Sequence, residues 1–147
     1  MIYLDTSYLA RLYLCDPGFE HVRALAATDQ VACSFHGELE LFAVFHRKCR
    51  EGVLDAAMFA AVLGQYDMER QISAITWLPA TDAIIDTACQ AFRVLPPTVF
   101  LRAADALHLA CAKQHGFREV YTNDRHVIAA APHFGIQGVN LIPPPTT

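Results

Sequence analysis

Short apolar segments alternate with longer helix-like segments along almost the whole chain, and this alternation most restricts the folds that are possible. The expected strands are residues 2–4, 31–33, 75–78, 120–121 and 138–141, and the expected helices are residues 8–14, 19–27, 34–52, 55–70, 82–92, 101–115 and 124–131. Parallel strands need helix-length connections, so this order favours a parallel sheet with helices on both faces. We therefore predict a three-layer α/β/α fold with a roughly five-stranded parallel sheet.

The size and composition of the chain fit one domain. Its 147 residues, 54% hydrophobic content and mean hydropathy of +0.25 supply one sizeable core, so residues 1–147 are predicted to form a single domain ending in a Pro-rich tail at 143–147. No stretch of about 18 apolar residues predicts a membrane span. The five cysteines are odd in number and widely spaced, which favours small core residues in a reducing cytoplasm.

The charge balance limits how this chain could bind nucleic acid. Only 18% of residues are charged and the formal net charge is −4. A broadly basic surface is therefore not expected, which argues against a passive nucleic-acid binder. It does not argue against a metal-dependent nuclease, whose acidic residues are offset by the metal.

Four carboxylates stand in apolar surroundings and indicate where the chemistry lies. They are Asp5 after the first strand, Glu40 in SFHGELELF, Asp105 in LRAADALHLACA and Asp124 in VYTND. A carboxylate removed from water without a partner is costly or becomes protonated. Several such acids in one chain therefore suggest that a divalent cation binds among them.

The predicted strands bring two of these acids to one edge of the sheet. Asp5 ends the first strand and Asp124 follows the fourth, and ligands of open parallel sheets collect at the carboxyl ends of strands. Asp105 lies on a helix where, between Ala103 and Ala112, only Asp105 and His108 are polar. A cap or an Arg such as Arg102 could satisfy Asp105 by itself, but the company of the other acids favours a functional role.

The residue pattern alone leaves the fourth acid open. Glu38 and Glu40 are two positions apart and point to nearly opposite sides of a helix. Periodicity slightly favours Glu38 as the buried one, and either acid could simply stabilise the first turn of the helix.

Oxygen-only clusters suit Mg²⁺ or Mn²⁺ better than zinc, and such an ion can promote hydrolysis of a phosphodiester. Thr6 or Ser7 could support the site, although capping the following helix is the expected role for at least one of them.

Four segments in order resemble the motifs of the PIN-domain ribonucleases, specifically the VapC-like toxins of toxin–antitoxin pairs. They are YLDTS, Ser34 followed by ELFAVFHRKCREG, LRAADALHLACAKQHG and VYTNDRHVIAAA, and they span nearly the whole chain. The resemblance implies a Mg²⁺- or Mn²⁺-dependent endoribonuclease that hydrolyses RNA. It also implies a cognate antitoxin whose tail blocks the groove, and a toxin homodimer that forms a heterotetramer or larger assembly with the antitoxin.

By position, the resemblance assigns the catalytic acids to Asp5, Glu40, Asp105 and Asp124. Metal binding falls to Asp5, Asp105 and Asp124, with Thr6 and Ser7 in support. Ser34 stands six residues before Glu40 and Arg47 seven after it, as in the family pattern, so Glu40 is chosen and Glu38 is held in reserve.

Several basic and apolar residues have possible roles beside this site. The candidate phosphate-binding residues are Arg11, Arg47, Arg102 and Arg125. His108 and His126 are expected to pack near the acids or support them. The candidate apolar surface for the antitoxin comprises Leu9, Leu12, Tyr13, Phe42 and Phe45, which could equally only cover the sheet.

Other functions fit less well. A signalling receiver domain needs paired acids early in the chain, and a haloacid-type phosphatase needs Asp where Ser7 stands. A non-catalytic PIN-like module that binds RNA or protein is the remaining alternative, although none of the four acids is missing.

Overall fold

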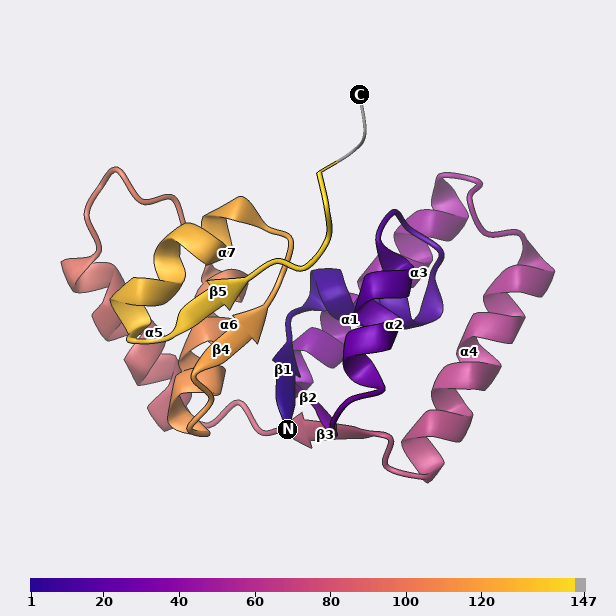
Figure 1. Cartoon of the computed structure of the whole chain (residues 1–147), viewed down its shortest axis with the longest axis horizontal. Helices are drawn as coiled ribbons and strands as arrows, with labels where there is room; N and C mark the ends of the chain where they lie inside the picture. The colour runs from indigo at the N-terminus through magenta and orange to yellow at the C-terminus, as the bar shows by residue number, and fades with distance from the viewer. Residues whose placement is uncertain (145–147) are drawn as a thin grey trace.

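The computed structural model describes residues 1–144, and its centre is a five-stranded sheet in which every pairing is parallel (Figure 1). The strands are β1 (Ile2–Leu4), β2 (Val31–Ser34), β3 (Ile75–Leu78), β4 (Glu119–Tyr121) and β5 (Gln137–Val139), in the spatial order β3-β2-β1-β4-β5. The predicted sheet is confirmed. Residues 145–147 of the predicted Pro-rich tail lie outside the described residues.

Helices cover both faces of the sheet, which confirms the three-layer architecture. They are α1 (Thr6–Tyr13), α2 (Phe19–Ala26), α3 (Phe35–Arg50), α4 (Ala56–Gln71), α5 (Asp82–Val94), α6 (Ala103–Gln114) and α7 (Arg125–Ala130), followed by a 3-10 turn, η1 (Ala131–Phe134). Successive side chains of a strand point alternately into the two halves of the core, one on each face of the sheet. In β1, Tyr3 packs with α5, α6 and η1, whereas Leu4 packs with α1, α3 and α4.

Short polar side chains fix the beginnings of several helices. Ser34, Asp55 and Asp124 accept hydrogen bonds from the backbone N–H groups near the starts of α3, α4 and α7. The expectation that Thr6 or Ser7 caps α1 is wrong, because the side chain of Asp5 accepts from the backbone N–H of Tyr8 instead. The first acid of the predicted site is therefore also the N-cap of its helix.

The chain after α6 differs in detail from the predicted elements. The last helix ends at Ala130, because Pro132 falls in the tighter η1 turn. β5 ends at Val139 and not at residue 141. Beyond this strand, the side-chain oxygen of Asn140 accepts a hydrogen bond from the hydroxyl of Tyr8 on α1, and the backbone N–H of Leu141 donates to the same hydroxyl.

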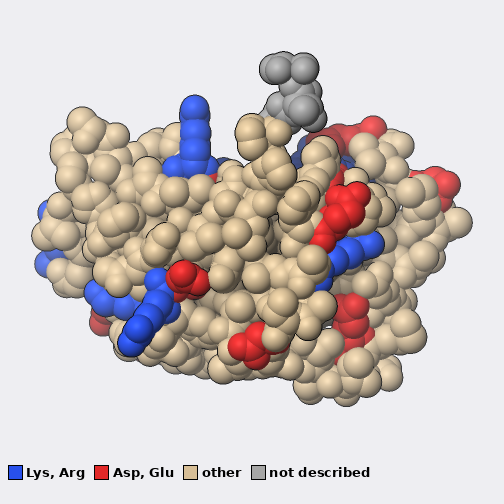
Figure 2. All heavy atoms as spheres, in the orientation of Figure 1, with Lys and Arg blue, Asp and Glu red and all other residues tan. Residues whose placement is uncertain are grey.

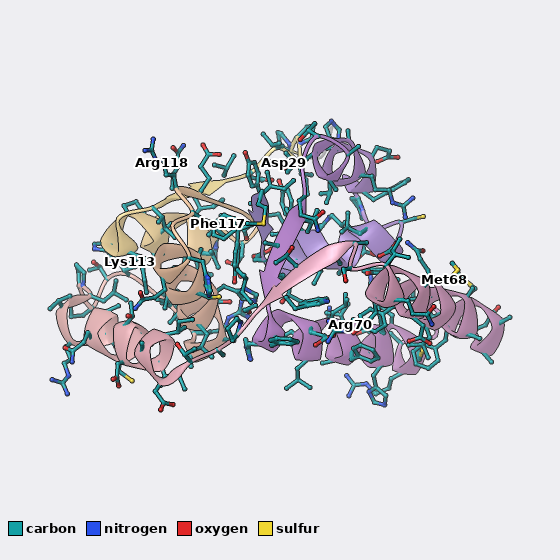
Figure 3. All side chains as sticks on the ribbon, turned by 90° about the horizontal axis from the view of Figure 1, so that it is seen from below. Asp29, Met68, Arg70, Lys113, Phe117 and Arg118 are labelled. Carbon is teal, nitrogen blue, oxygen red and sulfur yellow. The ribbon has the colours of Figure 1, made fainter. Side chains whose placement is uncertain are left out.

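The carboxyl ends of β1 and β4 meet at one edge of the sheet, and Asp5 and Asp124 lie just beyond them. Chain connections leave β1 toward β2 on one side, while β4 lies on its other side, which is the arrangement that opens a crevice in parallel sheets. Figure 3 views the opposite edge, where Asp29, Phe117 and Arg118 lie near the beginnings of these strands.

The surface agrees with the low charge of the sequence. Among residues 1–144 on the face shown in Figure 2, basic and acidic side chains are scattered and form no continuous basic patch. No helix in this part of the chain is both long and apolar enough to cross a membrane. Of the five cysteines, Cys33 and Cys111 are buried as expected, whereas Cys15 and Cys89 are exposed.

Candidate active site

A cleft of about 320 Å³ lies at the carboxyl end of β1 and contains all four predicted acids. The residues that line it are Asp5, Thr6, Ser7, Ala10, Arg11, Asp16, Glu40, Val44, Arg47, Arg102, Asp105, His108 and Asp124. They come from α1 and the loop that follows it, from α3 and α6, and from the start of α7, which are distant in sequence. The fold therefore collects acids, hydroxyls and basic groups around one small opening.

Asp5 is the most buried acid of the cleft, with 5% of its surface exposed. Its Oδ1 accepts hydrogen bonds from Ser7 Oγ at 2.6 Å and from the Tyr8 backbone N–H at 3.0 Å. Burial nevertheless raises the pKa of Asp5 above its ordinary value. Among the described residues no basic side chain forms an ion pair with it, so its negative charge is only partly compensated.

Asp105 and Asp124 share one arginine. Arg102 Nε lies 2.8 Å from Asp105 Oδ2, and Arg102 Nη2 lies 2.7 Å from Asp124 Oδ2. The other oxygen of Asp124 caps α7 by accepting from the His126 N–H at 2.8 Å. Asp105 is therefore paired with Arg102, the possibility that the sequence left open, and it also lies in the same cleft as the other acids.

Glu40 is held by a hydroxyl and a buried histidine. Thr6 Oγ1 donates to Glu40 Oε2 at 2.5 Å, and His108 Nε2 lies 2.9 Å from the same oxygen. Partial burial favours a higher pKa for Glu40, but the contacts with His108 and Thr6 outweigh it and lower the pKa to about 2. Glu40 therefore remains charged and fixed in one orientation.

His108 lines the cleft and contacts Glu40 directly, which agrees with the packing or supporting role expected for it. Burial by itself would lower the pKa of this imidazole, but contacts with Cys33 and Glu40 raise the pKa to about 10. Its Nδ1 lies 3.0 Å from the hydroxyl of Tyr3 on β1. One signal was available, because His108 follows Asp105 by three residues and so shares its side of α6. His126 instead packs against the ring of Phe100 and does not line the cleft.

Glu38 lies outside the cleft. Its carboxylate accepts from the Tyr66 hydroxyl and pairs with Arg70 Nε at 3.2 Å. The side chain of Glu38 is 18% exposed and that of Glu40 is 30% exposed, so periodicity had identified the more buried acid. The burial of Glu38 is due to α4, whereas Glu40 is the one that faces the other acids.

Three of the four candidate phosphate-binding arginines border the cleft. Arg11 donates to the backbone oxygens of Ser7 and Pro17, and Arg47 makes a long contact of 3.9 Å with Glu51. Arg102 is the third. Arg125 does not line the cleft; its Nε donates to His126 Nε2.

Most of the apolar set considered for the antitoxin lies in the core. Leu9 and Phe45 are fully buried and Tyr13 is 6% exposed, because they pack between the sheet and α4. The sheet-covering alternative is correct for these three residues. Only Phe42 and Leu12 retain appreciable exposure.

The carboxylates of the cleft are the type of ligand that a hard divalent cation needs, but in this structure they are not close enough together to coordinate one. No group of three or more His, Cys, Asp or Glu residues within 1–144 is arranged to hold a metal ion. The guanidinium of Arg102 lies between Asp105 and Asp124. However, the cleft offers several carboxylate oxygens, and within residues 1–144 Asp5 forms no ion pair with a basic side chain, which is the chemistry that Mg²⁺ or Mn²⁺ favours.

Comparisons with known proteins agree with this architecture. The model of the PIN domain family matches residues 2–132. Solved structures with similar folds include FitAcB from Neisseria gonorrhoeae, with 23% identity, a TM-score of 0.73 and coverage of 95% of this chain and 97% of that chain. VapC20 of Mycobacterium tuberculosis, a toxin that cleaves the sarcin–ricin loop, has 21% identity, a TM-score of 0.69 and coverage of 88% and 95%.

A toxin–antitoxin complex from Klebsiella pneumoniae has 18% identity, a TM-score of 0.62 and coverage of 95% and 96%. A comparison with curated proteins gave no match. At these identities the solved structures establish the fold, while the family match extends over most of the sequence. The chain therefore belongs to the PIN-domain family.

Proposed function

We propose that this protein is an endoribonuclease that uses Mg²⁺ or Mn²⁺ to hydrolyse RNA phosphodiester bonds, and that it is the toxin of a toxin–antitoxin pair. The observation that carries the proposal is the meeting of Asp5, Glu40, Asp105 and Asp124 in one cleft of a PIN domain. These acids come from four separate segments, so chance proximity along the chain does not explain their convergence.

Asp5, Asp105 and Asp124 are the residues that would hold the cation. When bound there, a divalent cation would neutralise the crowded carboxylates, polarise the scissile phosphate and lower the pKa of a water molecule, which could then attack the phosphate as hydroxide. The orientation of Asp5 is fixed by hydrogen bonds from the hydroxyl of Ser7 and from the backbone N–H of Tyr8 at the start of α1. Glu40, fixed by Thr6 and His108, would orient a water molecule by accepting a hydrogen bond from it, because its lowered pKa keeps it charged.

The substrate would be held by the rim of the cleft. Arg11 and Arg47 lie beside the acids and could each bind a phosphate oxygen, and Arg125 lies further out. Because the cleft is small and the rest of the surface is not strongly basic, an unpaired RNA segment fits better than a long duplex.

The proposed partner is an antitoxin that blocks this cleft. The support is the fold shared with toxins and with a toxin–antitoxin complex. An antitoxin segment with an Arg side chain could pair with the acids in place of the cation. The expected assembly is a toxin homodimer that forms a heterotetramer or larger complex, which light scattering of the toxin alone and with the product of the neighbouring reading frame would test.

The decisive experiment uses the purified chain with a pool of single-stranded and stem-loop RNAs. Cleavage should require Mg²⁺ or Mn²⁺, stop with EDTA, and be lost in Asp105→Asn while circular dichroism remains unchanged. Asp82→Asn is the matched control, because Asp82 is an acid in the first turn of another helix and lies outside the cleft. Equal cleavage by Asp105→Asn would reject the assigned site. RNA binding without any cleavage would instead favour the non-catalytic module.

A further inference from the structure

Arg102 occupies an unusual place among the acids of the cleft. It stands at the N-cap position of α6 but makes no side-chain capping bond. Its guanidinium instead joins Asp105, on the first turn of α6, to Asp124, at the start of α7. One monovalent cation therefore bridges two of the three carboxylates assigned to the divalent cation.

His108 is a second cationic group that contacts one of the four assigned acids, and it is held more firmly than Arg102. His108 is 2% exposed and is enclosed by Tyr3, Thr6 and Glu40. The side chain of Arg102 is 59% exposed, and among residues 1–144 its hydrogen bonds go only to the two carboxylates. An exposed ion pair on a long side chain is weak and easily exchanged, whereas a buried one is not. Of the two groups, Arg102 is the one that can leave.

We infer that Arg102 and the divalent cation compete for the carboxylates of Asp105 and Asp124, and that the displaced guanidinium then binds a phosphate of the RNA. This inference rests on the proposed function. A guanidinium left between the two acids would lie beside a doubly charged ion and be repelled by it. Phosphate presents the same forked oxygen geometry as carboxylate, so the displaced group has a suitable new partner within its reach.

This exchange has a thermodynamic consequence. While Arg102 occupies the carboxylates, the apparent affinity for the cation is reduced by the fraction of molecules in which the site is free. RNA that binds Arg102 increases that fraction. Cation and RNA should therefore strengthen each other's binding by the same factor.

The first test measures Mn²⁺ affinity by electron paramagnetic resonance of the free ion. Arg102→Gln should bind Mn²⁺ about tenfold more tightly than the wild type, because the competing group is gone. Arg125→Gln is the matched control, since it removes the same charge from a nearby side chain that, among the described residues, forms no ion pair with Asp105 or Asp124; its Mn²⁺ affinity should change little. Equal or weaker binding by Arg102→Gln would overturn the inference. If neither the wild type nor Arg102→Gln binds Mn²⁺, the proposed function itself fails.

The second test uses an RNA analogue that cannot be cleaved, at saturating Mn²⁺. Arg102→Gln should bind this RNA about tenfold more weakly, although it binds the cation more tightly. A purely structural role for Arg102 would weaken both. Loss of both affinities would therefore contradict the exchange.

A third measurement follows the wild-type protein and does not depend on the variant. The Arg102 Nε–H resonance should move when Mg²⁺ is added, in step with the backbone resonances of Asp105. A resonance of Arg102 that stays unchanged while Asp105 responds would show that the cation binds without displacing the guanidinium.

Discussion

Nε2 of His108 lies 2.9 Å from Oε2 of Glu40, which joins a buried residue of α6 to an acid of α3 that stands 68 positions earlier in the chain. The contact places a cationic group behind Glu40, the one of the four assigned acids that is not assigned to the metal. Glu40 is thereby compensated from within the protein, whereas Asp5, whose pKa burial still raises despite the nearby His108, is compensated only in part.

The His108–Glu40 contact should give a distinct pH dependence of stability. The pKa of His108 is raised from 6.5 to about 10, so its contribution is complete below pH 6.5 and is lost as the pH rises toward 10. The pKa of Glu40 is lowered from 4.5 to about 2, so its contribution is present above pH 4.5 and is lost as the pH falls toward 2. Urea unfolding between pH 6.5 and 10 should show the alkaline loss in the wild type and not in His108→Gln.

The same pair should be coupled energetically. A double-mutant cycle with His108→Gln and Glu40→Gln should give a coupling free energy of about 2 kcal/mol at pH 7, as for a hydrogen bond between charged groups. His126→Gln serves as the control histidine, because its side chain packs against Phe100 and accepts from Arg125, away from the His108–Glu40 contact. Additive effects of the two cleft substitutions would contradict the contact.

Asp5→Asn should abolish catalysis and stabilise the metal-free fold. Burial raises the folded-state pKa of Asp5, so the native protein binds its proton more readily and stability falls as the pH rises past the ordinary Asp value. Removing the charge removes this loss, and Asn can still cap α1. Thermal unfolding in EDTA at pH 7 should show a higher Tm for the variant, while RNA cleavage falls by at least about 100-fold. A lower Tm would mean that Asp5 is already well compensated.

The two neighbouring glutamates of α3 provide a matched pair of variants. Glu40→Gln should greatly reduce RNA cleavage, because Glu40 lines the cleft and Glu38 does not. Glu38→Gln should retain cleavage and lose about 1 kcal/mol of stability, since it weakens the contacts with Tyr66 and Arg70. Initial cleavage rates together with chemical unfolding distinguish the two effects. The reverse result would restore Glu38 as the fourth acid.

Gly37 allows the histidine to lie where it does. A Cβ at this position would come within 2.4 Å of Cys33 Sγ and 2.8 Å of His108 Cε1, both of them buried. Gly37→Ala should therefore cost about 1–3 kcal/mol and displace His108 from Glu40. Gly64→Ala in α4 meets nothing within 4 Å and should stabilise the protein by about 0.5–1 kcal/mol. Chemical unfolding of both variants checks the contrast.

The sequence by itself determined the alternation of strands and helices, the beginnings of helices near Ser34 and Asp55, and the position of Asp5 at the end of the first strand. These features depend on neighbours a few residues away, where hydrophobic spacing and turn chemistry act directly. The resemblance to PIN-domain motifs added the choice of Glu40. Local pattern could not make that choice, because both sides of α3 are covered.

Only the tertiary structure decided which helix packs against each side of α3. Glu38 faces α4 and Glu40 faces α6, since the sheet edge and the packing of α3 set the rotation of that helix. Likewise, Arg102 reaches Asp124 only because α6 packs against β4 and α7, which brings the start of α6 close to the start of α7. Contacts between residues tens of positions apart depend on how whole elements pack, and no local spacing along the chain encodes that.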